Sequence, residues 1–302
     1  MRAFSAGTGS VSLLLVAIRD NSEAETRLRP VSSRQNALVK DLRKAFSQGQ
    51  PTEQGCIAIE GLRIIEEAIR SGLRFQAVFL SESARTQSAR LLPQISSHTE
   101  MLLLPDDVFR SAVDTETPQG VAALVKLKPA KLDDLIEQVS DDLLLVVVAG
   151  IQDPGNLGTI IRSAEAFGSR GILLGEKTVS HANAKVVRAS AGSLFREPMI
   201  HVKLEETIAL LKSRGVRVAA GSSHKGRPLD QVDLTGPLAL IIGNEGAGVA
   251  PEILSQADEL VTIAHSPRVE SLNAGIAASI LLYEISRQRA TRSGDRRDRV
   301  IG

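Results

Sequence analysis

The sequence predicts an α/β protein built from two units, and three observations lead to that class. The chain has 302 residues, which is enough for roughly two domains that each bury a core. Hydrophobic residues make up 43% and charged residues 24% of it, as in ordinary globular proteins. Near-continuous apolar segments alternate with helical ones, a pattern typical of a parallel sheet covered by helices on both faces.

The first part of the chain divides into an extension and a small α/β unit. Residues 1–30 are interpreted as an N-terminal extension whose apolar run, Val11 to Ile18, is too short to span a bilayer. The flanking residues do not make a convincing signal peptide. In residues 31–128, Ser32 and Ser33 are expected to cap a helix. Strands CIAIEG, QAVFL, MLLLP and GVAALVKL follow, with helices between them.

The second part of the chain repeats the alternation on a larger scale. Residues 129–142 contain KLDDLIEQVS and predict a helical join. Residues 143–289 then read as a second domain that begins with LLLVVVAG and closes with a long helix. Residues 290–302 form a basic tail. The arginines that crowd this end either lie in solvent or contact an RNA backbone: Arg287, Arg289, Arg292, Arg296, Arg297 and Arg299.

Composition limits the classes of site that the chain can carry. Lys and Arg number 36 against 35 Asp and Glu, so any basic surface must be local. The single cysteine, Cys56, excludes an internal disulfide and suits a reducing cytoplasm. The five histidines do not cluster with Cys or carboxylates at ligand spacing, so no metal is expected. Aromatic residues make up 3% and Trp is absent, so RNA would be recognised by phosphate contacts and shape rather than by base stacking.

A ligand site is expected in the loops after the strands, because ligands of open α/β sheets bind beyond the carboxyl ends of strands. The first loop follows VVVAG. Its Asn156 can cap the next helix, and Gly155 and Gly158 allow close backbone approach to a ligand. Arg162 lies off the apolar stripe of that helix. Taken alone, a capped helix with one solvated Arg is the better explanation of the pattern.

The second and third loops carry polar residues beside glycines and a small-residue helix. Gly243, Gly246 and Gly248 match neither the dinucleotide nor the phosphate-loop spacing, which argues against nicotinamide and ATP enzymes. Glu245 lies among them. In the third loop, Ser271 and Asn273 flank Leu272 where a helix begins. The small residues of that helix allow close approach of another backbone, within the fold or across a dimer: Ala274, Gly275, Ala277, Ala278 and Ser279.

In order and spacing, the three loops together resemble the motifs of the SpoU/TrmH family of RNA ribose methyltransferases, of the SPOUT class. The matching residues are Asn156-x-Gly158-x-x-x-Arg162, then Gly243-Asn-Glu245-Gly246, then Glu270-Ser271-Leu272-Asn273 with Leu282-Tyr283-Glu284. The N-terminal unit, with IAIEGLRIIEEAIRSG and TPQGVAALVKL, resembles the ribosomal-protein-like substrate-binding domain of many members.

The resemblance implies a C-terminal α/β knot, with a parallel sheet threaded as a trefoil, a homodimer and a bound S-adenosylmethionine. It assigns the cofactor to Gly243, Gly246, Ile263 and Leu272. Where members usually have Pro-Met after that Ile, this chain has Ala264-His265, which changes the pocket but not the reaction. The expected catalytic residues are Arg162, Asn156, Glu245, Ser271 and Asn273.

The expected reaction is methyl transfer to a ribose 2′-hydroxyl. The family assigns activation of the hydroxyl to Arg162. A guanidinium stays protonated, so we favour a role in holding the neighbouring phosphate and stabilising oxyanion charge.

Family analogy favours ribosomal RNA over tRNA as the substrate. A non-catalytic RNA-binding protein and a base methyltransferase are the alternatives. The candidate RNA contacts, each of which could equally belong to a solvated helix face, are Arg34, Lys40, Arg43, Lys44 and Arg63.

Overall fold

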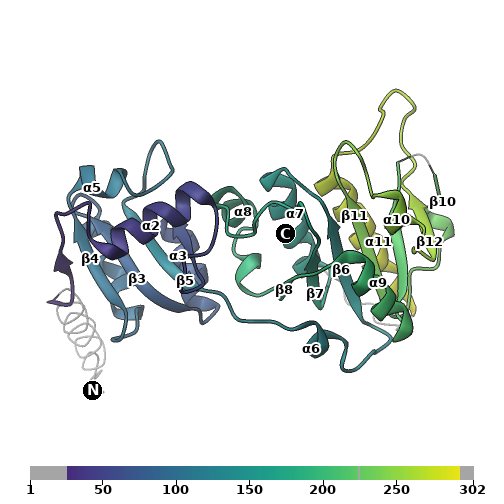
Figure 1. Ribbon diagram of the computed structural model, residues 1–302, viewed down its shortest axis with the longest axis horizontal. Coiled ribbons are helices and arrows are strands. Elements are labelled where there is room, and N and C mark those ends of the chain that lie inside the picture. Colours follow the sequence, from purple (N-terminus) through teal and green to yellow (C-terminus); the bar gives the residue numbers. More distant parts are fainter. Residues whose placement is uncertain (1–25, 224, 293–302) are drawn as a thin grey trace, which may run out of the picture. The chain divides into compact units, whose positions relative to one another are not determined.

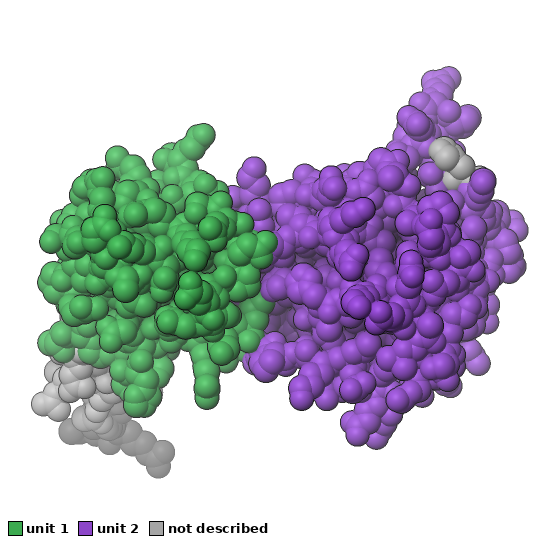
Figure 2. Space-filling view, viewed as in Figure 1, with its two compact units in different colours: residues 1–127 green, residues 128–302 purple. Residues whose placement is uncertain are grey.

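The computed structural model describes residues 26–223 and 225–292, and its chain divides into two compact units, Met1–Leu127 and Lys128–Gly302 (Figures 1 and 2). The apolar run from Val11 to Ile18 and the arginines at positions 296, 297 and 299 lie outside the described residues. Each unit has its own sheet, as the alternation of apolar strands and helices predicts.

The first unit is built on a mixed sheet with the strand order β1-β4-β3-β5-β2. Strand β5 runs antiparallel to β2 and β3, whereas β3 pairs parallel with β4. Its elements are β1 Arg29–Pro30, α2 Ala37–Gln48, β2 Cys56–Glu60, α3 Leu62–Arg70, β3 Arg74–Ser81, α4 Arg85–Ser88, the 3-10 turn η1 Ala89–Gln94, β4 Glu100–Leu104, α5 Asp106–Arg110 and β5 Val121–Lys126.

Two expectations for this unit need correction. Helix α2 is capped by Asn36, whose side-chain oxygen accepts the backbone N–H groups of Leu38 and Val39, and not by Ser32 or Ser33. Asn and Ser cap equally well, so the sequence offered three candidates within five residues. The expected extension also overlaps the sheet, because Arg29 and Pro30 pair with β4 as a short edge strand.

The second unit is built on a sheet in which every described pairing is parallel, with the strand order β10-β12-β9-β11-β6-β7-β8. Its elements are α6 Leu132–Ile136, β6 Leu144–Ala149, α7 Pro154–Ala166, β7 Gly171–Leu174, α8 Ala184–Ala189, η2 Ser193–Phe195, β8 Met199–His201, α9 Leu204–Ser213, β9 Arg217–Gly221, β10 Arg227–Pro228, η3 Leu229–Gln231, β11 Leu238–Gly243, α10 Pro251–Leu254, β12 Glu259–Thr262 and α11 Ala274–Arg292.

The central strands of this sheet are buried on both faces. Every residue of β6 and five of the six of β11 are buried, which explains why these segments read as unbroken apolar runs. The segment expected as a join contributes to this core, because Leu135 and Ile136 of α6 are buried against it. The threading of the chain as a trefoil knot stays a prediction from the family resemblance.

Candidate active site

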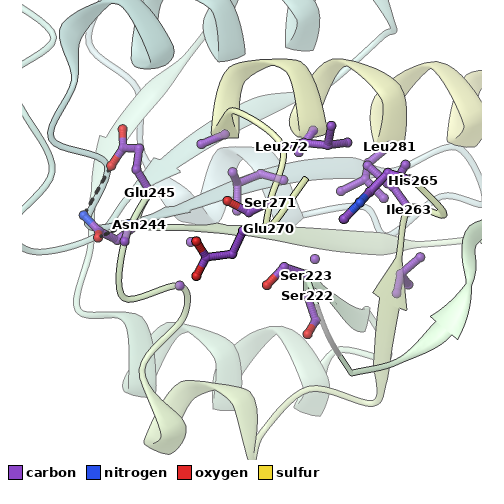
Figure 3. Close-up of a pocket in the computed structure, with 18 residues that line it drawn as sticks. Ser222, Ser223, Asn244, Glu245, Ile263, His265, Glu270, Ser271, Leu272 and Leu281 are labelled. Carbon is purple, nitrogen blue, oxygen red and sulfur yellow. Dashed lines mark hydrogen bonds between the residues drawn. The ribbon is translucent and has the colours of Figure 1, made fainter. Parts of the chain in front are cut away.

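A pocket lies where β9, β11 and β12 end and α11 begins, and it encloses a cavity of about 300 Å³ (Figure 3). This is the edge of a parallel sheet at which ligands are expected. The residues that line it come from four segments: Gly221, Ser222, Ser223, Ile242, Gly243, Asn244, Glu245, Gly246, Gly248, Val261, Ile263, His265, Glu270, Ser271, Leu272, Ala274, Ala277 and Leu281.

The glycine loop after β11 is a small hairpin organised by Asn244. The backbones of Asn244 and Gly248 exchange two hydrogen bonds, of 2.9 and 3.0 Å. The side-chain oxygen of Asn244 accepts the N–H groups of Gly246 and Ala247, both at 3.0 Å, and its amide donates to the carbonyl of Gly150 at 2.8 Å. A Cβ on Gly243 would lie 2.5 Å from the carbonyl carbon of Gly248, so the tight return of this loop requires glycine there.

Glu245 connects the glycine loop to the first motif. Its carboxylate accepts the side-chain amide of Asn156 at 2.9 Å, and the backbone N–H groups of Asp153 at 3.3 Å and Gln152 at 3.4 Å. Burial raises the pKa of Glu245, but the hydrogen bonds from Asn156 and from the backbone outweigh it, so that this pKa lies below its ordinary value. Glu245 thus holds two backbone amides of the loop that precedes α7 and the side-chain amide of Asn156.

Asn156 is not the helix cap that the sequence suggested. Helix α7 is capped by Asp153, whose carboxylate accepts the backbone N–H of Asn156 at 2.7 Å. Pro154 follows at the first helical position, where its missing N–H costs nothing. Asn156 is therefore a buried residue of the first turn whose amide is held by Glu245.

Gly158 approaches another helix and not a ligand. A Cβ at this position would lie 2.4 Å from the Cβ of Ala189 and 2.9 Å from the carbonyl oxygen of Val186, both on α8. Contacts this short do not occur between real atoms, so α7 and α8 can pack at this distance only through glycine.

The small residues at the start of α11 serve packing within the fold. Gly275 lies against Thr159 of α7, since a Cβ on it would be 3.1 Å from the Thr159 Cβ. One turn further on, the Ser163 and Ser279 hydroxyls are 2.7 Å apart. The stripe therefore packs α11 on α7. The apolar side chains of Ile276 and Tyr283 on α11 are 53% and 49% exposed.

Arg162 lies on α7 between Thr159 and Ser163, the two residues that contact α11, and its side chain is exposed. Within residues 26–223 and 225–292, nothing forms an ion pair with it. Its guanidinium is thus free to bind an anion that is not part of the chain.

The third motif divides between the pocket and the helix start. Ser271 and Leu272 line the pocket, whereas Asn273 does not. The side-chain oxygen of Asn273 accepts the backbone N–H of Ile276 at 3.1 Å, which is the capping role that a polar residue at this place can fill.

Comparison with known proteins identifies the family. The SpoU rRNA methylase family model matches residues 143–283, and the model of the MRM3-like substrate-binding domain matches residues 36–123. A 23S rRNA (guanosine(2553)-2′-O)-methyltransferase, RlmP of Bacillus subtilis, is 31% identical over 85% of this chain and 99% of its own length. The chain belongs to the SpoU rRNA methylase family. The resemblance drawn from the three motifs is confirmed, and with it an S-adenosylmethionine-dependent RNA methyltransferase.

Two further relatives support the assignment to the SpoU family. The 23S rRNA (guanosine-2′-O-)-methyltransferase RlmB of Nitrosomonas europaea is 33% identical over 75% of this chain and 91% of its own. An AdoMet-bound rRNA methyltransferase from Sinorhizobium meliloti superposes with a TM-score of 0.75 at 28% identity, covering 86% of this chain and 98% of its own. SpoU enzymes use S-adenosylmethionine as methyl donor, and it is bound in the structures of the Sinorhizobium meliloti enzyme and of the SpoU methyltransferase AviRb from Streptomyces viridochromogenes.

The pocket of this SpoU chain has the groups that such a cofactor needs. All four residues expected at the cofactor line it, namely Gly243, Gly246, Ile263 and Leu272. Ile263, Leu272 and Leu281 give its wall apolar surface, and Ser222 and Ser223 add hydroxyl groups. The cofactor carries a net positive charge, and the charged side chains that line the pocket are carboxylates.

Sequence reasoning assigned no role to several residues that line the pocket. Asn244 and Glu270 belong to the second and third motifs. Because they are next to residues with an assigned role, the sequence could have pointed to them. His265 was noted as a departure from the family pattern, and the structure places it in the pocket wall. Ser222 and Ser223 follow β9 and belong to no motif. Only the rule that ligands meet strand ends could have suggested them.

The five basic residues expected to bind RNA fall into two groups. Arg34 pairs with Asp107 at 2.6 Å, Lys44 pairs with Glu53 at 3.5 Å, and Arg43 donates to the carbonyl of Ser111 at 3.0 Å. Lys40 and Arg63 are exposed and, in the part of the chain that the structure describes, have no such partner.

Of the arginines near the C-terminus, those in α11 contact the chain itself. Arg289 donates to three backbone carbonyls, those of Asp142, Leu143 and Gly236, at 2.6, 3.0 and 2.6 Å. Arg287 pairs with Glu284 at 2.7 Å. These two side chains stabilise the fold, so an RNA contact by this end would have to come from other residues.

Proposed function

We propose that the chain transfers a methyl group from S-adenosylmethionine to a ribose 2′-hydroxyl of ribosomal RNA. The observation that carries this proposal is the arrangement of the first motif. Asn156 is held by Glu245 of the glycine loop at 2.9 Å, beside a pocket with all four expected cofactor contacts, and Arg162 on the same helix has no partner in the described chain. Ribosomal RNA is preferred because the named relatives RlmP and RlmB act on it.

The residues of the chain would act on the RNA and not on the donor. The bound cofactor supplies a methyl group on a sulfonium, whose leaving thioether is neutral. The 2′-hydroxyl must therefore be held in line and lose its proton, for which we propose a water or the neighbouring phosphate as the acceptor. We assign Arg162 to the neighbouring phosphate and to the oxyanion charge that develops on the 2′-oxygen, because a guanidinium keeps its proton. Asn156 and Asn273 orient the ribose or Arg162, and Ser271 binds near the same oxygen.

The apolar surface of α11 supports a homodimer. Ile276 and Tyr283 lie seven residues apart, hence on one face of the helix, and are 53% and 49% exposed. We take this face as the candidate interface, because a second copy packed on it would remove both side chains from water. The Ile276→Glu variant is expected to be monomeric at concentrations at which the wild type is dimeric, as measured by sedimentation equilibrium. A dimer that survives this change would place the interface elsewhere.

The location of the enzyme follows from its substrate. Among the described residues, no helix is long and apolar enough to cross a membrane. We propose the cytoplasm, where ribosomal RNA is found in bacteria.

The function is tested by methyl transfer from labelled S-adenosylmethionine to ribosomal RNA and tRNA that lack the modification, followed by nucleoside analysis. Label in a 2′-O-methyl nucleoside of the large ribosomal RNA supports the proposal. Label in a 2′-O-methyl nucleoside of tRNA would support the proposed reaction and contradict the proposed substrate. Label on a base would contradict ribose methylation. Cofactor binding without label in any RNA would favour an RNA-binding protein that has kept the fold.

A further inference from the structure

The charged side chains around the pocket have one sign. Glu245 and Glu270 line it, His265 is the other titratable side chain in its wall, and neither Lys nor Arg is among the lining residues. This distribution of charge attracts a cationic ligand and gives no such advantage to a neutral nucleoside.

The two carboxylates differ in what they contact. Glu245 accepts hydrogen bonds from Gln152, Asp153 and Asn156, so its charge is used inside the chain. Glu270 is exposed, and in residues 26–223 and 225–292 it has neither a hydrogen bond nor an ion pair. Figure 3 shows its carboxylate in the middle of the pocket, between the Asn244–Glu245 pair on one side and Ser222 and Ser223 on the other.

The methyl donor and its product differ by one positive charge. S-adenosylmethionine carries a sulfonium and S-adenosylhomocysteine a neutral thioether, while their adenosine and amino-acid parts are identical. A carboxylate beside the sulfonium attracts the donor and not the product.

We propose that the Glu270 carboxylate recognises the sulfonium charge, so that the pocket binds the cationic donor in preference to its neutral product. This inference rests on the proposed binding of S-adenosylmethionine in this pocket. Because Glu270 is exposed, solvent screens the attraction, and we expect a contribution of about threefold to tenfold in relative affinity. The carboxylate would thereby favour replacement of the product by a new donor molecule after each methyl transfer.

The test is isothermal titration of three ligands: S-adenosylmethionine, sinefungin, which carries an ammonium near the place of the sulfonium, and S-adenosylhomocysteine. All titrations are made at the same pH, 8. The Glu270→Gln variant should lose the preference for the two cationic ligands while its affinity for S-adenosylhomocysteine stays unchanged. The Glu270→Asp variant, which keeps the charge, should retain part of the preference.

The matched control is Glu252→Gln, which removes an exposed carboxylate of α10 that does not line the pocket. It should leave all three affinities unchanged. An equal loss for all three ligands in Glu270→Gln would mean that the carboxylate binds a shared group such as the ribose hydroxyls, and would overturn the inference. Unchanged affinities would overturn it too. If the wild type bound none of the three, the assignment of the pocket itself would fail.

Discussion

The region around Glu245 and the region around Arg162 differ in how far the chain itself satisfies their polar groups. Glu245 accepts hydrogen bonds from the first-motif loop and from Asn156, and Asn244 fixes the rest of the glycine loop. Arg162, less than two helical turns after Asn156, has no ion-pair partner in the described residues. Within the first motif, Asn156 is therefore held by the chain itself, whereas Arg162 is left with a charge that a substrate can use.

The largest expected effect comes from removing Arg162. The Arg162→Ala variant should lower turnover by about a thousandfold or more, because an oxyanion and phosphate contact is lost. Affinity for S-adenosylmethionine should be unchanged, since Arg162 does not line the pocket. Arg162→Lys keeps the charge without the two-pronged geometry and should recover only part of the activity. Loss of cofactor binding in a folded Arg162→Ala protein would mean that Arg162 helps to build the cofactor site and is not reserved for the RNA.

Breaking the link between Asn156 and Glu245 should cost less. We expect Asn156→Ala and Glu245→Ala each to lower turnover about tenfold to a hundredfold and to lower the free energy of unfolding by about 1 to 2 kcal/mol. Because both residues act through the same 2.9 Å hydrogen bond, the double variant should be little worse than either single one. Fully additive losses of activity, measured in a double-mutant cycle, would mean that the two residues work separately.

A third region, at the far end of α7, contains a carboxylate that the fold satisfies poorly. Burial and the neighbouring Glu165 raise the pKa of Glu197 from 4.5 to about 7, and its Oε2 is buried without a partner in the described residues. The folded protein therefore holds a proton that the unfolded chain releases. The contribution of Glu197 to stability is therefore fully present below about pH 4.5 and is lost as the pH rises through 7.

The Glu197→Gln variant tests this pH dependence. It should match the wild type near pH 5 and be more stable by about 2 kcal/mol near pH 8.5, measured by denaturant unfolding. The exposed Glu205 on α9 supplies the control, since Glu205→Gln should leave the difference between the two pH values as in the wild type. If the difference in free energy of unfolding between Glu197→Gln and the wild type does not change with pH, the pKa of Glu197 is not raised in the folded protein.

The smallest expected effects concern the basic residues of the N-terminal unit. Lys40→Ala and Arg63→Ala should each weaken RNA binding a few-fold and reduce the salt slope by less than about one. Lys44→Ala, whose side chain already pairs with Glu53 at 3.5 Å, is the matched control and should change binding less. RNA binding is measured by filter binding at several salt concentrations. Equal effects from all three variants would mean that an ion pair within the chain does not decide whether a basic side chain contacts RNA.

The positions of the strands were predictable because burial on both faces leaves an unbroken apolar run, as in β6 and β11. The two-residue strands β1 and β10 were missed, since Arg29–Pro30 and Arg227–Pro228 carry no periodicity. The mixed direction of the first sheet also left no mark in the sequence.

In the site, motif order located the pocket, and the four expected cofactor residues line it. The caps were harder to predict. Asp153, Asn156 and Pro154 all suit a helix start, and only the backbone geometry decides that Asp153 accepts the N–H. The roles of Gly158 and Glu270 depend on what lies across from them in space, which spacing along the chain does not reveal.

The contact of Gly158 with Ala189 and Val186 bears on how mutational scans of this enzyme are read. A larger residue at 158 would push α7 away from α8 and displace Arg162, one turn further along the same helix. Activity would then fall as steeply as for a residue that touches the RNA, although position 158 touches only α8. Replacing Ala189 by glycine would remove only its Cβ from this contact and leave the backbone oxygen of Val186 at 2.9 Å. A suppressor would therefore have to move α8 as a whole, and it would restore turnover without restoring the motif.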